Sequence, residues 1–121
     1  MKIINSRVHG IIDYLVVVFL LAAPLLFGLP YTTTLFTYAL GGIHLALTLL
    51  TNTEMGLIKM IPFPIHGWIE LIVALALVGA AFYLGSLDGD LARNFYLGFA
   101  GAVFLTWALT DYRASQGSFK S

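Results

Sequence analysis

The chain has 121 residues, of which 60% are hydrophobic, and its six basic and six acidic side chains give a formal net charge of zero. A soluble domain of this size could not cover so much apolar surface with so few charges, and balanced charge without a basic cluster argues against nucleic acid as a partner. The chain has no cysteine, which excludes disulfides, thiolate metal sites and thiol chemistry.

The charge-free stretch between Asp13 and Glu54 predicts two membrane helices. At about 1.5 Å per helical residue, it is long enough to cross a hydrocarbon core roughly 30 Å thick twice. We expect a first helix at about 7–27, ended by the sequence Gly28-Leu29-Pro30, and a second at about 33–51. Because the connection is short, these two helices should form an antiparallel hairpin.

The second half of the chain has the same organisation. A loop at 52–62 leads to a third helix at about 64–84, which begins at a proline suited to the first turn of a helix. A polar turn at 85–90 precedes a fourth helix at about 91–112, and a short polar tail follows. The sequence therefore predicts an all-α fold, a bundle of four transmembrane helices in a single integral membrane domain over residues 1–121.

The basic residues predict the orientation of this bundle. With four spans, only Arg93 falls on one side of the membrane, and the other five basic side chains fall together on the opposite side: Lys2, Arg7, Lys59, Arg113 and Lys120. Cytoplasmic loops are enriched in Lys and Arg. We therefore expect both termini and the middle loop to lie in the cytoplasm.

An internal repeat relates the two halves. The octet VHGIIDYL at 8–15 aligns with IHGWIELI at 65–72, and Leu50-Thr51-Asn52 aligns with Leu109-Thr110-Asp111. Both units, at about 6–53 and about 63–112, begin on the same side of the membrane. The pattern therefore predicts two tandem two-helix repeats related by an axis along the membrane normal.

These motifs resemble a known family. The His-Gly-x-x-Asp-Tyr opening at 9–14, the proline at 24 and the doubled two-helix unit are similar to the SPW-repeat proteins, which are small bacterial membrane proteins. The family is named for a Ser-Pro-Trp in the first helix of each unit. This chain has Ala-Pro-Leu at 23–25 and Ala-Ala-Phe at 80–82. The resemblance implies a four-helix protein of the bacterial cytoplasmic (inner) membrane, and it implies no activity.

Two histidine–carboxylate pairs are the main candidates for chemistry. His9 with Asp13, and His66 with Glu70, are each spaced by four residues, which puts each pair on one helix face. The duplication brings both pairs to one end of the bundle, where Asp111 also falls. A lone charge inside the membrane costs on the order of 2–3 kcal/mol or more, so these carboxylates should be paired, protonated or turned toward the bundle interior.

Three interpretations of this cluster remain open. The favoured one is structural, with the pairs tying helix starts together. The second is a metal site, since two histidines and two or three carboxylates suit Zn, Mn or Fe. The third is proton handling, because an imidazole–carboxylate pair in a low dielectric has tunable pKa values. No hydroxyl or thiol nucleophile lies in a motif with a base, so we do not expect an enzyme.

His44 lies inside the second helix, after a pair of glycines. We favour an interhelical hydrogen bond for its imidazole, with Thr106, Thr48 or Tyr38 as partner. The alternative is an axial ligand to haem or another tetrapyrrole, with the glycines making room for the macrocycle. The absence of a cofactor is the favoured expectation, with a metal ion or a tetrapyrrole as alternatives.

Small residues spaced by four predict close helix packing, inside the bundle by default or against another subunit: Gly42 with Ala46, and Gly98 with Ala102. Four short helices with almost no mass outside the membrane leave little room for an autonomous machine. We therefore expect a non-enzymatic accessory or assembly subunit of a larger membrane complex, or a homo-oligomer, with lipid and membrane proteins as partners. The alternatives are a small transporter or proton- or metal-handling protein, and a tetrapyrrole-binding subunit.

Overall fold

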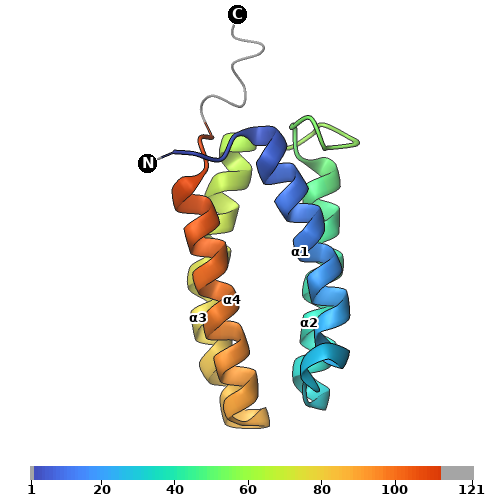
Figure 1. Ribbon diagram of the computed structural model, residues 1–121, viewed down its shortest axis with the longest axis vertical. Coiled ribbons are helices and arrows are strands. Elements are labelled where there is room, and N and C mark those ends of the chain that lie inside the picture. The colour runs from blue at the N-terminus through green and yellow to red at the C-terminus, as the bar shows by residue number, and fades with distance from the viewer. Residues whose placement is uncertain (1, 113–121) are drawn as a thin grey trace, which may run out of the picture.

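The computed structural model describes residues 2–112, and these form four helices. In chain order they are α1 (Ser6–Phe27), α2 (Tyr31–Leu50), α3 (Phe63–Asp88) and α4 (Asp90–Leu109). The helices pack as two antiparallel hairpins, α1 with α2 and α3 with α4 (Figure 1). The prediction of an all-α four-helix bundle is confirmed.

Three of the helices, α1, α2 and α3, are long and apolar enough to cross a membrane. The fourth helix, α4, is as long as α2, with 20 residues, and lies along α3 (Figure 1). Its first turns, however, contain the polar residues Asp90, Arg93 and Asn94. Large apolar side chains are exposed on all four helices, among them Leu25, Ile43, Ile72 and Leu105. Such a surface suits contact with lipid rather than water.

Capping residues set where α1 begins and ends. The side chain of Asn5 accepts a hydrogen bond from the backbone N–H of Val8 at 2.9 Å, which is an N-cap. The helix ends at Gly28, whose φ of 64° is in the left-handed region that favours glycine. These bounds match the predicted first helix closely.

The connection between α3 and α4 is tighter than the sequence predicts. The predicted polar turn at 85–90 is wrong, because α3 continues to Asp88 and Gly89 alone separates the two helices. Gly89 has a φ of 98°, so a single residue without a side chain reverses the chain. At its other end α4 stops at Leu109, earlier than the predicted 112.

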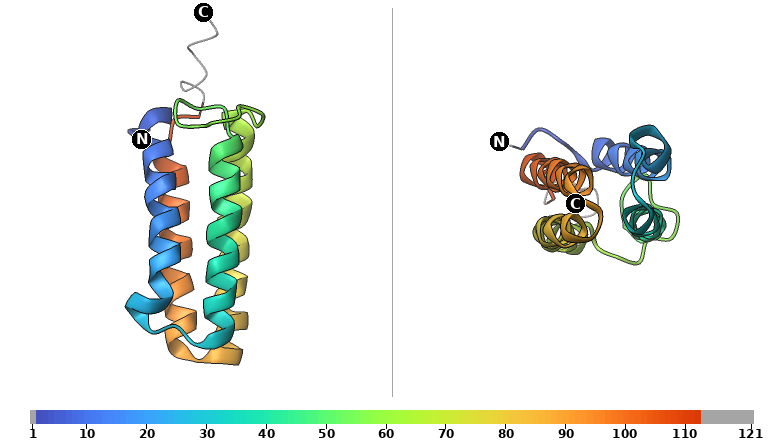
Figure 2. Two further views of the ribbon diagram at one scale, coloured as in Figure 1. Left: turned by 90° about the vertical axis from the view of Figure 1, so that its right-hand side faces the viewer. Right: turned by 90° about the horizontal axis from the view of Figure 1, so that it is seen from below.

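The start of α1, the α2–α3 loop and the end of α4 lie at the same end of the bundle (Figure 2). Two short parallel pairings join them: Ile4 with Thr110, and Thr51 with Ile61. The segment before the first helix of each unit thus pairs with the last residues of the other unit. One pairing links α1 to α4 and the other links α2 to α3, as expected if an approximate two-fold axis relates the two units.

The small residues predicted to bring helices together lie on the outside of the bundle. Gly42, Ala46, Gly98 and Ala102 are all exposed, and a Cβ added at either glycine would meet no atom within 4 Å in the described part of the chain. Close packing between helices inside the bundle therefore does not use these glycines. Contact with another subunit stays a prediction.

Asp88 joins the two hairpins at the opposite end of the bundle. Its Oδ2 accepts hydrogen bonds from the backbone N–H and the hydroxyl of Thr33, at 2.7 and 2.6 Å. Thr33 is buried in the first turn of α2. A carboxylate at this position satisfies an N–H that has no partner within the helix and interacts favourably with the helix dipole.

We expect Asp88→Ala to lower the free energy of unfolding by about 1–2 kcal/mol, because both groups of Thr33 lose their acceptor. Thermal unfolding in detergent measures this change. Asp90→Ala is the matched control, since its 84% exposed side chain pairs with Arg93 at 3.4 Å on the surface. That variant should change stability by less than about 0.5 kcal/mol. Equal losses in the two variants would contradict a role for Asp88 in joining the hairpins.

Candidate metal centre

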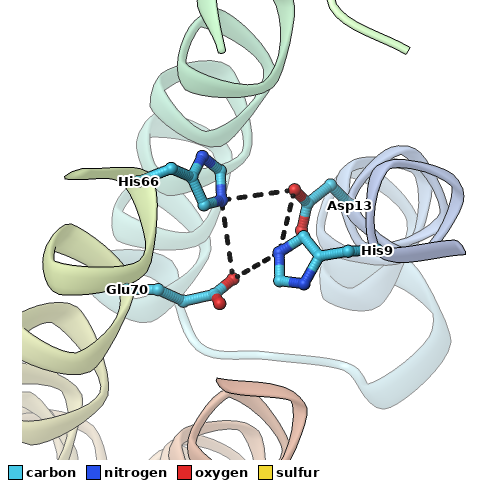
Figure 3. Close-up of side chains that lie close together, drawn as sticks. All are labelled: His9, Asp13, His66 and Glu70. Carbon is cyan, nitrogen blue, oxygen red and sulfur yellow. Dashed lines mark ion pairs between the residues drawn. The ribbon is translucent and has the colours of Figure 1, made fainter. Parts of the chain in front are cut away.

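The two predicted histidine–carboxylate pairs meet in the interior of the bundle. His9 and Asp13 project from α1, His66 and Glu70 project from α3, and all four side chains are buried. One ligand atom from each residue lies within 4.8 Å of the other three. Figure 3 shows the two pairs facing each other across a common centre.

Asp111, the fifth residue predicted for this cluster, is not a member of the group of four. It follows the end of α4, where its backbone N–H donates to the carbonyl of Ile4. Arg113, one of the basic residues used to predict the orientation, lies outside the described residues, as does Lys120. The centre therefore consists of two imidazoles and two carboxylates.

Nitrogen and oxygen atoms alternate around the centre. Nε2 of His9 lies 3.3 Å from Oδ2 of Asp13 and 3.3 Å from Oε2 of Glu70. Nε2 of His66 lies 3.4 and 3.8 Å from the same two oxygens. Neither Nε2 makes a hydrogen bond within residues 2–112, although both are buried. Each ring thus presents this nitrogen to the centre, at ion-pair distance from both oxygens but without the alignment of a hydrogen bond to either.

Two threonines place a proton on Nδ1 of each imidazole. Nδ1 of His9 is 2.9 Å from the hydroxyl of Thr110, and Nδ1 of His66 is 2.8 Å from the hydroxyl of Thr51. Each hydroxyl donates its single proton to the backbone carbonyl four residues earlier, at 2.6 Å. The hydroxyl oxygen must therefore accept a hydrogen bond from Nδ1–H. In a neutral imidazole, this leaves the lone pair of Nε2 directed at the centre.

These threonines were not recognised as site residues from the sequence. The signal was present in the internal repeat, because Thr51 and Thr110 occupy equivalent positions at the ends of the second helices. The repeat aligns them, but only the crossed pairing of the two units brings each threonine to the histidine of the other unit. An alignment of the two halves cannot show that crossing.

Tyr112 is a further contact that the sequence did not predict. Its hydroxyl donates to Oε1 of Glu70 at 2.5 Å, so Oε2 remains directed at the centre. Burial, with the Glu70 carboxylate beside it, raises the pKa of Tyr112 above its usual range, which keeps this hydroxyl protonated. The ring packs over Gly67, where an added Cβ would come within 2.9 Å of it.

His44 approaches the centre from α2. Its Nε2 lies 3.5 Å from Oδ1 of Asp13, is buried and makes no hydrogen bond in the described part of the chain. The hydroxyl of Thr48, one of the predicted partners, donates to the backbone carbonyl of His44 and not to its ring. Two cavities of about 30 and 40 Å³ border His44. Each has room for about one water molecule, far too little for a tetrapyrrole.

The four side chains of the centre match the size and charge of a divalent metal ion. Neighbouring ligand atoms at 2.0–2.2 Å from a common ion lie roughly 3–3.5 Å apart. The four nitrogen–oxygen distances are 3.3, 3.3, 3.4 and 3.8 Å, and all four ligand atoms lie within 4.8 Å of one another. Two carboxylates beside two neutral imidazoles have a charge of −2, which a divalent cation would neutralise in a buried site.

Comparisons of this chain with protein-family models, with curated proteins and with solved structures find no match. The resemblance to SPW-repeat proteins therefore stays a prediction. Function has to be inferred from the residues of the centre.

Proposed function

We propose that this is a membrane protein that binds one divalent transition-metal ion through His9, Asp13, His66 and Glu70. The observation that supports this most strongly is the pair of buried Nε2 atoms, which face two carboxylate oxygens without hydrogen bonding to them. In metalloproteins, a ligating histidine typically donates its other N–H to a neighbouring group. Here the hydroxyls of Thr110 and Thr51 accept this hydrogen bond from His9 and His66.

A network of ion pairs without a metal is the competing function of the same residues. It would require each imidazole to be doubly protonated and to direct Nε2–H at a carboxylate oxygen. The four groups lie at ion-pair distances of 3.3 to 3.8 Å, but within residues 2–112 no Nε2 is aligned with an oxygen as a hydrogen bond requires. If the imidazoles were neutral instead, lone pairs of nitrogen and oxygen would face each other at 3.3 Å. A cation between them removes this conflict.

The donor set narrows the choice of metal. Two imidazoles and two carboxylates, with no thiolate, suit Zn²⁺, Fe²⁺ or Mn²⁺. Only the transition metals among the common ions favour nitrogen ligands, so the two histidines argue against Mg²⁺ or Ca²⁺. The chain would bind this ion either by itself or as a subunit of a larger complex. The role as an accessory subunit stays a prediction.

We further propose that all four helices cross a bacterial inner membrane, with the metal centre near its cytoplasmic face. Lys2, Arg7 and Lys59 lie at the end of the bundle that contains the centre, whereas Arg93 lies at the other end. This asymmetry supports a cytoplasmic location for the first end. The ion would then enter from the cytoplasm.

The proposal predicts one tightly bound ion per chain. The protein is stripped with a chelator in detergent, reloaded with Zn²⁺, Fe²⁺ or Mn²⁺ in separate experiments, and measured by elemental mass spectrometry. We expect one equivalent of at least one of these metals after removal of the excess. Less than a tenth of an equivalent of all three would rule out the metal centre.

Thr51→Val tests the role of the threonines in the same experiment. Loss of the hydroxyl that accepts from His66 should weaken metal binding by about 10–100-fold, as other changes beside metal ligands do. Thr48→Val is the matched control, one turn before Thr51, because its hydroxyl also bonds a backbone carbonyl four residues back and is not among the hydrogen-bond partners of His9 or His66. Equal affinity in the two variants would contradict the assignment of Nδ1–H to Thr51.

A further inference from the structure

A cavity of about 40 Å³ lies beside the metal centre, in the interior of the bundle. Residues of all four helices line it, and its polar groups belong to Asp13, His44, Glu70 and Thr106. Two of these are the carboxylates of the centre, so the cavity opens on the carboxylate side of the ion. Its volume suits one water molecule or a molecule of similar size.

His44 also lines this cavity. Its Nε2 is buried and makes no hydrogen bond within the described chain, although Oδ1 of Asp13 is 3.5 Å away. A contact of 3.5 Å is too long for a good hydrogen bond, so an occupant of the cavity that bonds more closely to this nitrogen is favoured. A molecule in the cavity would therefore lie beside both the metal ligands and an imidazole.

We propose that this cavity is an open coordination position of the metal centre, which binds a small uncharged molecule of about two heavy atoms within reach of both the ion and His44. This inference rests on the proposed function. Four protein ligands leave a metal such as Fe²⁺ with unfilled positions, and sites that bind exogenous ligands keep such a position open. The other side of the centre is closed, because Thr110 and Thr51 hold the two histidines there.

An apolar groove between α1 and α4 gives access to this position from the lipid. The groove has a volume of about 310 Å³, and its lining includes four phenylalanines together with Gly98 and Ala102. Figure 2 shows α1 and α4 as neighbours around the bundle. Phe99 and Ala102 line both the groove and the cavity, so these two side chains form the wall between them.

The groove favours uncharged ligands. Its walls are almost entirely apolar, and a charged molecule would have to leave water to enter it. Gly98 and Ala102 are small enough to leave the groove open. Access to the cavity would therefore explain small residues at these exposed positions. Small gases and other neutral molecules that dissolve in lipid fit this route.

Nitric oxide binding to the Fe²⁺-loaded protein tests the inference. Under anaerobic conditions we expect the electron paramagnetic resonance signal of a ferrous nitrosyl, with one nitrosyl per bound iron. Iron that binds at one equivalent but forms no nitrosyl would overturn the open position and leave the proposed function intact. Failure to bind Fe²⁺, Zn²⁺ or Mn²⁺ would instead overturn the proposed function.

Two variants locate the nitrosyl in the cavity. Ala102→Phe should slow nitrosyl formation at least tenfold without changing the iron content, because the larger ring fills the wall between groove and cavity. Leu105→Phe is the matched control on the same helix, at a side chain that is 57% exposed, and should react like the wild type. Equal rates in these two variants would overturn the route through the groove.

His44→Leu gives a second test that does not depend on filling space. Loss of the hydrogen bond to the ligand should weaken nitric oxide binding about fivefold to tenfold while one iron remains bound. Unchanged affinity and an unchanged nitrosyl stretching frequency would overturn the placement of the ligand beside His44. Iron content and thermal unfolding of each variant show that it is folded.

Discussion

Glu70→Gln is expected to lower the affinity for Zn²⁺ by at least about 100-fold. The amide retains the size of the side chain and an oxygen for Tyr112, but it removes one of the two negative charges of the centre. Changes to groups that only orient metal ligands cost 10–100-fold, so loss of a ligand charge should cost more. Competition with a chromophoric chelator measures the affinity.

The same variant should lose stabilisation by the metal. Zn²⁺ at 100 times its dissociation constant adds about 2.7 kcal/mol to the stability of the wild type. If binding is 100-fold weaker, the same concentration adds only RT ln 2, about 0.4 kcal/mol. Thermal unfolding in detergent with and without Zn²⁺ should therefore show a large shift for the wild type and almost none for the variant.

Glu54→Gln is the matched control for these measurements. Glu54 is exposed at the same end of the bundle, accepts a hydrogen bond from Ser6 at 2.6 Å and is not part of the centre. Its substitution should leave the Zn²⁺ affinity within about twofold of that of the wild type, since interactions between exposed charges and a distant ion are screened. A similar loss in both variants would mean that Zn²⁺ binds by general charge attraction rather than at the centre.

Gly56→Ala is expected to lower the free energy of unfolding by about 2–3 kcal/mol. A Cβ at this position would lie 1.9 Å from the backbone carbonyl oxygen of Thr51, so the loop itself has to shift. Thr51 pairs with Ile61 and accepts a hydrogen bond from His66. We therefore expect weaker metal binding together with the loss of stability, both measured in detergent.

Gly42→Ala should have the opposite effect on stability. This glycine lies in the interior of α2, and an added Cβ meets no atom within 4 Å in the described chain. Replacing a helical glycine by alanine stabilises by about 0.5–1 kcal/mol where the space is free. A Gly56→Ala variant as stable as Gly42→Ala would contradict the close contact between Gly56 and Thr51.

The number of helices and their approximate positions could be predicted from the sequence because they depend on local properties. A charge-free run of sufficient length predicts a membrane helix without reference to its neighbours. Gly28 correctly marked the end of α1, since a helix commonly ends at a glycine in the left-handed region. The turn at 85–90 was misplaced, because polar residues alone do not show that Gly89 completes the reversal by itself.

The four ligands of the candidate centre followed from helix periodicity and from the repeat. A spacing of four places His9 beside Asp13 and His66 beside Glu70, and the duplication places both pairs at one end. Whether these pairs face each other or the lipid depends on how the helices rotate within the bundle. That rotation is decided by packing between helices, which no local pattern encodes.

The sequence by itself thus determined a helical protein with helices long and apolar enough to cross a membrane, and the side chains of the candidate centre, since hydropathy and the helical repeat act within a few residues. Only the tertiary structure decided which groups complete the centre. Thr51, Thr110 and Tyr112 follow the ends of helices; each threonine reaches a histidine of the other unit, and Tyr112 reaches Glu70 of its own unit. Their positions, like that of the cavity beside His44, depend on distances between helices, and these are set by the packing of the whole bundle.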